Sequence, residues 1–239
     1  MEGFIEDLKL GIYQTFILDN NYQYFVRGVG VTLLVTAFAL LLGLVLGVLV
    51  GIIRSAHDQQ PEKKKGIVLR VLNGICKVYL TVIRGTPTMI QLLIMYYVIF
   101  GSVNIDKRIV AILAFGINSG AYVAEIVRSG IMAIDIGQFE AGRSLGLGYP
   151  ATMWHIILPQ AFKNVLPALG NEIIVLLKET SISGYIALTD LTHGGNVIRS
   201  QTYSAFMPLI AVALIYLAIV SLLAAGVSRL ERRLRTSER

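Results

Sequence analysis

The chain has 239 residues, of which 55% are hydrophobic and 15% charged, with a mean hydropathy of +0.68. Too few charges are present to cover a soluble domain of this size, so the composition predicts a membrane protein and excludes a disordered one. The net charge of +6 does not indicate nucleic acid binding, because the basic residues stand at the ends of apolar runs. The single cysteine, Cys76, excludes an internal disulfide and a cysteine-rich metal site.

The first 27 residues are acidic rather than basic, so they do not resemble a secretory signal. Aromatic side chains are spread through them, which is typical of an interfacial segment leading into a membrane helix. Residues 28–53 then form a charge-free run of 26 residues, more than the roughly 20 that a spanning helix needs. We therefore expect the first span there. Its glycines at 43, 47 and 51 recur on one helix face and predict close packing against another helix: Gly43, Gly47 and Gly51.

Residues 54–66 form a polar loop, and the segment after it carries Arg70, Lys77 and Arg84 at every seventh position. One face of that segment is basic and the rest is apolar, which favours a helix lying along the membrane surface. Pro87 then ends this pattern. Proline suits the first turn of a helix, so a new helix is expected to begin there. We expect a second span over 87–102, preceded by a structural elbow made of Arg84, Gly85, Thr86 and Pro87.

Three further spans are expected from the apolar pattern, at 108–131, 160–178 and 204–228. The last is unambiguous, because it lies in a charge-free run of 29 residues. The 160–178 segment is interrupted by Pro167 and Gly170. Broken helices are tolerated in membranes where protein or a water-filled cavity satisfies the freed backbone groups. We therefore expect the fourth span to be broken and to face inward.

The lysine and arginine counts orient these five spans. Fifteen of the 21 basic residues lie on the side of the C-terminus and of the loop 132–159, five lie on the other side, and Lys178 is unassigned. The positive-inside rule therefore predicts an outside N-terminus and a cytoplasmic C-terminus. We expect a multi-pass protein of a bacterial cytoplasmic (inner) membrane, whose basic residues contact anionic lipid and not nucleic acid.

The loop 132–159, between the third and fourth spans, is too long for a plain connection. Residues 140–143 favour a short helix, and the stretch 146–150, with two glycines and Pro150, is expected to end it. A second apolar helix is expected from Trp154. The pattern predicts a helix-turn-helix pair at the cytoplasmic face.

This loop resembles the cytoplasmic loop of the permease subunits of ABC importers, in which E-A-A-x-x-x-G is followed after nine residues by I-x-L-P. The matching positions are Glu140, Ala141, Gly146, Ile156, Leu158 and Pro159. Gly142 stands where a second alanine is usual, which lowers helix propensity. The resemblance implies coupling to an ATPase, with small residues letting the helix enter the partner deeply. The implied coupling residues are Glu140, Ala141, Gly142, Arg143, Gly146 and Leu147.

A narrower resemblance covers nearly the whole chain. Residues 84–87 (RGTP), 118–122 (NSGAY) and 158–181 are similar to ABC permeases for polar amino acids, in the histidine, glutamine and arginine subfamily. The resemblance implies an all-α membrane protein with the type I ABC importer permease fold, in which residues 1–239 form a single permease domain. That fold has five transmembrane helices plus a cytoplasmic coupling helix pair.

The same resemblance implies how the work of import is divided. The chain would translocate a polar amino acid, two copies of a separate ATPase would hydrolyse ATP with magnesium, and an extracytoplasmic binding protein would deliver the substrate. A second permease copy, identical or a related paralogue, would complete a dimer. The chain has no G-x-x-x-x-G-K-[ST], H-E-x-x-H or C-x-x-C motif, so we expect no catalytic site, no metal and no cofactor on it.

Glu172 is the sharpest candidate for substrate contact, because it is a carboxylate inside an apolar segment. Burying it is costly unless a cation pairs with it, and the ammonium or cationic side chain of an amino acid would do so. An internal ion pair with Arg128 or Lys178 is the alternative. The remaining candidates for substrate contact are Asn171 beside it, and Asn118 and Ser119 in the third span as donors for a carboxylate.

Glu125 and Arg128 are three residues apart on one helix face, so we expect them to form a structural pair.

Two other classes of protein remain open. A secondary transporter of the same substrate would also bury Glu172, although such proteins are usually longer and internally repeated. A non-transporting membrane scaffold would explain the spans and not the loop.

Overall fold

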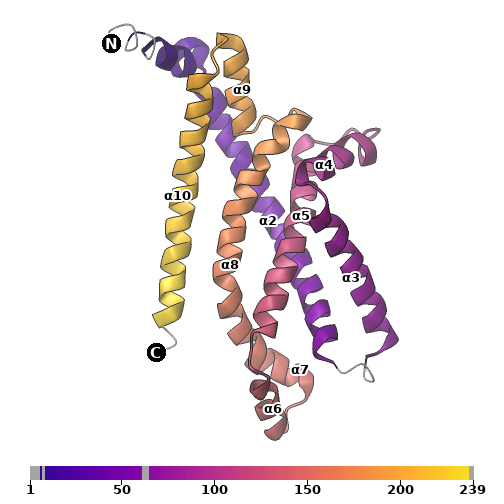
Figure 1. The fold of residues 1–239 in the computed structure, drawn as a ribbon. Helices are drawn as coiled ribbons and strands as arrows, with labels where there is room; N and C mark the ends of the chain where they lie inside the picture. Colours follow the sequence, from indigo (N-terminus) through magenta and orange to yellow (C-terminus); the bar gives the residue numbers. More distant parts are fainter. Residues whose placement is uncertain (1–5, 7–8, 61–64, 237–239) are drawn as a thin grey trace. The chain divides into compact units, whose positions relative to one another are not determined.

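The structure, a computed structural model, describes residues 6, 9–60 and 65–236 (Figure 1). Every regular element in these ranges is helical, which confirms the predicted all-α fold. Among the basic residues used to orient the chain, Lys63, Lys64 and Arg239 lie outside the described residues. The α-helices are α2 (Tyr22–Gln59), α3 (Ile67–Gly85), α4 (Thr88–Leu93), α5 (Lys107–Met132), α6 (Ile136–Ser144), α7 (Tyr149–Thr152), α8 (Leu158–Glu179), α9 (Leu191–Thr202) and α10 (Phe206–Thr236). Shorter π- and 3₁₀-helical segments lie at Tyr13–Ile17, Leu18–Asn20, Ile94–Ile99, Met153–Ile157 and Thr180–Ile186.

Three helices in the described residues are long and apolar enough to cross a membrane: Tyr22–Gln59, Lys107–Met132 and Phe206–Arg233. A shorter apolar stretch covers Thr88–Ile99, inside the second expected span. The count of five spans, and the boundaries given for them, therefore stay predictions.

Helix α8 overturns the expectation that the fourth span is broken. It runs without interruption and contains Pro167 in its interior. A proline removes one backbone hydrogen bond and can bend a helix, but the turns on either side keep their bonds. Gly170 serves packing rather than a break, because a Cβ there would stand 2.8 Å from Val227 Cγ1 of α10.

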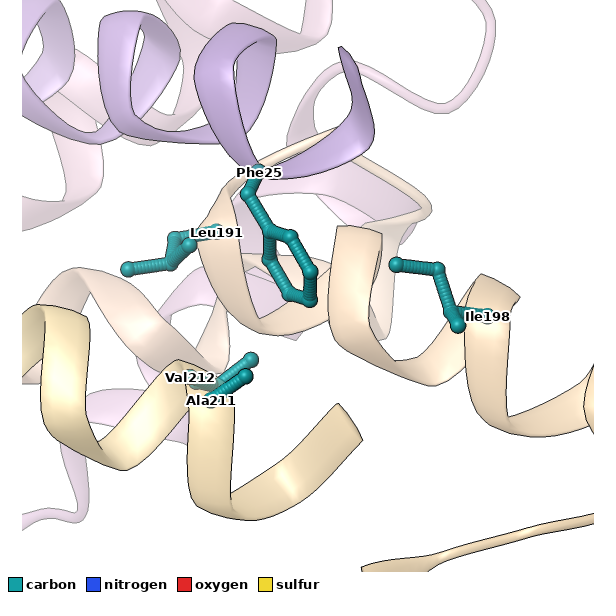
Figure 2. Packing of buried hydrophobic residues seen from close by; sticks show 5 residues of the cluster. All are labelled: Phe25, Leu191, Ile198, Ala211 and Val212. Carbon is teal, nitrogen blue, oxygen red and sulfur yellow. The ribbon is translucent and has the colours of Figure 1, made fainter. Parts of the chain in front are cut away.

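The chain divides into two compact units, and each is described by itself. The first comprises residues 1–39, 88–115 and 175–223. Its core lies where the start of α2, α9 and the first turns of α10 meet, as Figure 2 shows. The side chains at its centre are Phe25, Leu191, Ile198, Ala211 and Val212.

Helix α9 lies between the fourth and fifth expected spans, where the sequence analysis placed no element. It is held against α2 within the first unit. The amide of Leu191 donates to Thr32 Oγ1 at 3.2 Å, and a Cβ on Gly28 would stand 2.7 Å from the Leu191 Cα. Asp190 caps the helix by accepting from two amides of the first turn at 3.0 and 3.3 Å. An aspartate in this position is a helix start signal, and it could have identified α9 from the sequence.

The second unit comprises residues 40–87, 116–174 and 224–239. Its α2 and α5 segments pack closely at the glycines, as predicted. Cβ atoms added to Gly43, Gly47 and Gly51 would meet side-chain atoms of α5 at 3.0, 2.4 and 2.8 Å. This close approach supports two apolar clusters along α5, which consist of Val123, Val127, Ile131, Ile157 and Ala161, and of Leu80, Ala121 and Ala124.

Helix α3 packs on α5 in this second unit, and the Tyr79 hydroxyl donates to the carbonyl oxygen of Ile117 at 2.6 Å. Whether α3 lies along a membrane surface stays a prediction. The helix ends at Gly85 and α4 begins at Thr88, so the chain leaves the helical conformation at the predicted elbow. Thr86 is extended there, and its hydroxyl donates to a carbonyl oxygen one turn earlier at 2.8 Å.

Candidate functional site

The carboxylate of Glu172 lies on the part of α8 that belongs to the second unit, against α5. Ser119 Oγ donates to Glu172 Oε1 at 2.7 Å, and the two residues are 1% and 8% exposed. Gly43 lets α2 reach the same point, because a Cβ on it would stand 3.0 Å from Ser119 Oγ. Burying a carboxylate is tolerated when hydrogen bonds replace its water. The structure thus brings together two of the candidate residues that are 53 positions apart in the sequence.

The two candidate asparagines stand differently. Asn118 precedes Ser119 on α5 and is buried, with 1% of its surface exposed. Asn171 is exposed, although it is the sequence neighbour of the buried Glu172. Adjacent helical residues point about 100° apart, which separates these two side chains. Three of the four candidates therefore lie in the interior of this unit.

Arg128 is engaged with two carboxylates. Its guanidinium nitrogens lie 3.3 Å from Asp58 Oδ2 and 3.3 Å from Glu125 Oε2, so the predicted pair between Glu125 and Arg128 is present. Arg84 joins the same network at 3.8 Å from Glu125 Oε1, and its guanidinium carbon lies 5.7 Å from the centroid of the Tyr122 ring. These contacts tie α2, α3 and α5 together within the second unit.

Glu172 offers a negative charge and Ser119 a hydroxyl group at one buried point. Within the described ranges no group of three or more His, Cys, Asp or Glu side chains could hold a metal ion. A buried carboxylate with a hydroxyl donor can bind a cationic group by charge-assisted hydrogen bonds.

The predicted helix-turn-helix is also present in the second unit. Helix α6 begins after Asp135, whose carboxylate accepts from the amide of the second helical residue at 2.6 Å. It ends in a left-handed turn at Gly146, where φ is +77°. The amides of Gly146 and Leu147 donate back to the carbonyl oxygens of Arg143 and Gly142 at 2.9 and 3.0 Å. These two bonds form a Schellman motif, the common glycine-dependent end of a helix.

Two expectations about this helix pair are wrong in detail. Pro150 does not end the first helix but stands in the first turn of α7, where a missing amide hydrogen costs nothing. Gly142 was expected on the surface that enters the partner, but it is buried against α7. A Cβ at Gly142 would stand 2.6 Å from Thr152 Cγ2, so the glycine that replaces the usual alanine lets the two helices approach.

The outer surface of the pair carries the other expected coupling residues except Leu147, which is half-buried. Glu140, Ala141 and Arg143 are all exposed. Large apolar side chains stand exposed on the same helix pair, and such a mixture is typical of a protein contact surface. These side chains are Ile136 at 72%, Leu145 at 77% and Trp154 at 71% exposed. Ile136 and Leu145 were not expected as contact residues, although apolar residues at the ends of an otherwise polar helix are a readable signal.

Known proteins with similar sequences are membrane components of transport systems. The profile of the family described as "Binding-protein-dependent transport system inner membrane component" matches residues 68–236. The arginine transport system permease protein ArtQ of Bacillus subtilis (strain 168) is 35% identical over 217 residues, covering 90% of this chain and 94% of that protein. The glutamine transport system permease protein GlnP of Escherichia coli (strain K12) is 35% identical over 213 residues, with coverage of 88% and 92%.

Solved structures give the same picture. A crystal structure of an amino acid ABC transporter with histidines matches with a TM-score of 0.80 at 39% identity, covering 90% of this chain and 96% of that chain. An inward-facing MetNI methionine ABC transporter matches with a TM-score of 0.74 at 21% identity, covering 89% and 97%. The second similarity demonstrates a shared fold alone.

Proposed function

The chain belongs to the family of inner membrane components of binding-protein-dependent transport systems, and from this we propose that it carries a polar amino acid through a path that includes Glu172. Membership makes the chain the transmembrane permease subunit of an ABC importer, with ATP hydrolysis on a partner subunit and no enzymatic activity of its own. The family match also removes the two alternatives, a secondary transporter and a non-transporting scaffold. The relatives are named for transport of arginine and glutamine, which supports a polar amino acid as the substrate here.

The observation that carries the substrate proposal is the buried hydrogen bond between Ser119 and Glu172. A buried carboxylate beside a hydroxyl group offers the negative charge that a substrate ammonium group would need for a charge-assisted hydrogen bond. Arg128, one of the two cations that could have matched Glu172 internally, already contacts Asp58 and Glu125. We assign the substrate's positive group to Glu172 and its carboxylate to the side-chain amide of Asn118, which precedes Ser119 on α5.

The test is one variant read in two ways. Glu172→Gln keeps the shape of the side chain and removes its charge, and a charge-assisted hydrogen bond is worth roughly 1.5–3 kcal/mol. Equilibrium binding of labelled arginine or glutamine to the purified permease–ATPase complex should therefore weaken about 10- to 150-fold. Thermal unfolding in detergent should change little, because a neutral amide is cheaper to bury than a carboxylate.

The matched control is Lys163→Gln, which changes charge on an exposed position of the same helix and should leave binding as it was. Unchanged amino acid affinity in Glu172→Gln would remove Glu172 from the substrate path. A lowered unfolding temperature with unchanged affinity would support the alternative, an internal pair with Lys178.

We further propose that the helix pair from α6 to α7 enters the ATPase partner and carries its motion to the membrane helices. The exposed Glu140, Ala141 and Arg143, with the apolar Leu145 and Trp154 on the same pair, fit such a contact. Two ATPase copies, each with ATP and magnesium, would meet two permease copies, which are this chain twice or this chain and a paralogue. An extracytoplasmic binding protein would supply the amino acid. The N-terminus would lie outside and the C-terminus in the cytoplasm.

A further inference from the structure

The second unit contains a cavity of about 390 Å³ between α2, α3 and α5. Three cationic side chains line it, Arg54 from α2 and Lys77 and Arg84 from α3. One carboxylate, Glu125 from α5, lies at the same cavity. None of the candidate residues for amino acid contact lines this cavity.

The charges around this cavity do not balance. Glu125 forms ion pairs with both Arg84 and Arg128, and Arg128 also forms an ion pair with Asp58. Among the residues that the structure describes, Arg54 reaches only a neutral partner, because its terminal nitrogen donates to Asn73 Oδ1 at 2.9 Å. The Nε of Arg54 is buried without a hydrogen-bond partner in the described part of the chain. Lys77 likewise makes no ion pair with any residue that the structure describes. At the cavity itself, three cations therefore face one carboxylate.

The position of the cavity relative to the membrane follows from the sequence. Arg54 is the first charge after the uncharged run 28–53, so it stands at the edge of the hydrocarbon layer. Asn73 is at the same level through its hydrogen bond to Arg54, and Lys77 follows one helical turn later. A cation at this depth is costly unless an anion or a polar headgroup is within reach.

The neighbouring face of α3 is apolar and open. Val71, Ile75 and Val78 are 56%, 62% and 65% exposed. Thr81 lies on the cavity side, less than a quarter turn around the helix from Val78. A ligand that filled the cavity with an anionic group could therefore lay a hydrocarbon chain along α3.

We propose that this cavity binds the phosphate headgroup of an anionic phospholipid. Arg54 and Lys77 contact the phosphate, Arg84 held by Glu125 closes the inner end, and the acyl chains lie against the apolar face of α3. Basic pockets between membrane helices on the cytoplasmic side are suited to anionic headgroups, and guanidinium and ammonium groups both bind phosphate well. The proposed orientation of the termini decides only which leaflet supplies the lipid. A failure of the lipid proposal can therefore be distinguished from a failure of the proposed orientation.

The test uses the full chain purified in detergent and titrated with lipid, with bound lipid counted by native mass spectrometry. The probes are dioleoylphosphatidylglycerol, dioleoylphosphatidylcholine with the same acyl chains, and inorganic phosphate. A Lys or Arg near an anionic lipid contributes roughly 1 kcal/mol, which is about a fivefold change in affinity. We expect the first phosphatidylglycerol to bind about fivefold more weakly to Lys77→Gln and to Arg54→Gln, and to bind normally to Lys77→Arg. Lys77 is exposed, so its variants fold even if Arg54→Gln does not.

Lys163→Gln is the matched control, because it removes one exposed positive charge elsewhere in the same unit and should bind phosphatidylglycerol like the native chain. Equal affinity of the Lys77→Gln and Lys163→Gln variants would overturn the proposal. Equal binding of phosphatidylcholine and phosphatidylglycerol by the native chain would overturn it as well. Displacement of the lipid by millimolar inorganic phosphate or by the transported amino acid would assign the cavity to a soluble anion instead.

Discussion

Gly146 is the position in the helix pair where the backbone alone makes a quantitative prediction. Its φ of +77° lies in the left-handed region, and both Schellman bonds that end α6 depend on it. A Cβ built at Gly146 would meet no atom within 4 Å. A side chain there has room, so any cost of substitution comes from backbone conformation and not from a clash.

That cost has a known size and an order among side chains. A residue other than glycine in the left-handed region costs roughly 1–2 kcal/mol, asparagine costs less, and β-branched residues cost most. Gly146→Asn should therefore be mild, Gly146→Ala intermediate and Gly146→Val severe. One to two kcal/mol reduces the population of the native turn by a factor of about 5–30. Because α6 is short, a changed end would alter its exposed face, which we propose contacts the ATPase.

The assay is amino acid uptake into proteoliposomes, together with the amount of ATPase that co-purifies with each permease variant. We expect both quantities to fall in the order asparagine, alanine, valine, with membrane insertion unaffected. Gly148→Ala is the matched control, because Gly148 has φ of −68° and its added Cβ would lie 3.9 Å from the nearest atom. Normal uptake and ATPase association in Gly146→Val would refute the reasoning, as would an equal defect in Gly148→Ala.

Three further predictions concern packing, pH and topology. Gly47→Ala should lower the unfolding temperature in detergent, because its Cβ would stand 2.4 Å from a side-chain atom of α5. Gly74→Ala should leave the unfolding temperature unchanged, because its Cβ would have no atom within 4 Å. Equal effects of the two substitutions would contradict the packing argument. Burial raises the pKa of Asp190 to about 6, so unfolding free energy should fall by up to about 3 kcal/mol as pH rises from about 4 to 6. Asp190→Asn keeps the helix cap and should abolish that slope in unfolding measured across this pH range, and a slope that persists would assign it to other groups. A cysteine placed at position 104 should react with an impermeant reagent from outside intact cells and one at 236 should not; labelling at 236 would mean that the spans are miscounted.

Local features of the sequence were sufficient for the long apolar helices and the helix pair, but not for α9 or for the continuity of α8. A long apolar run predicts a membrane helix because the bilayer acts on each segment separately, and α2, α5 and α10 are helices long and apolar enough to cross a membrane. The spacing of Gly43, Gly47 and Gly51 was enough to predict close packing, because a helix repeats its face every three to four residues. The turn at Gly146 could also be predicted, because the end of a helix is formed by a few consecutive residues.

The continuity of α8 could not be read from the sequence. Pro167 and Gly170 are helix breakers by propensity, but packing against α10 overrides propensity and keeps the helix intact. The buried position of Gly142 could not be read from the sequence either. The need for glycine instead of alanine there depends on the Thr152 side chain, which packs against it in the folded structure.

By itself, the sequence determined the helical class, the membrane setting, the family and the helix pair of the loop 132–159, because hydropathy, helix period and turn chemistry act over a few neighbouring residues. Only the tertiary structure decided which polar side chains meet. Ser119 reaches Glu172 across 53 residues, and Arg54, Lys77 and Glu125 surround one cavity from three different helices. Such pairings follow from how the helix faces pack, and a single chain's pattern of residues carries no record of which face meets which.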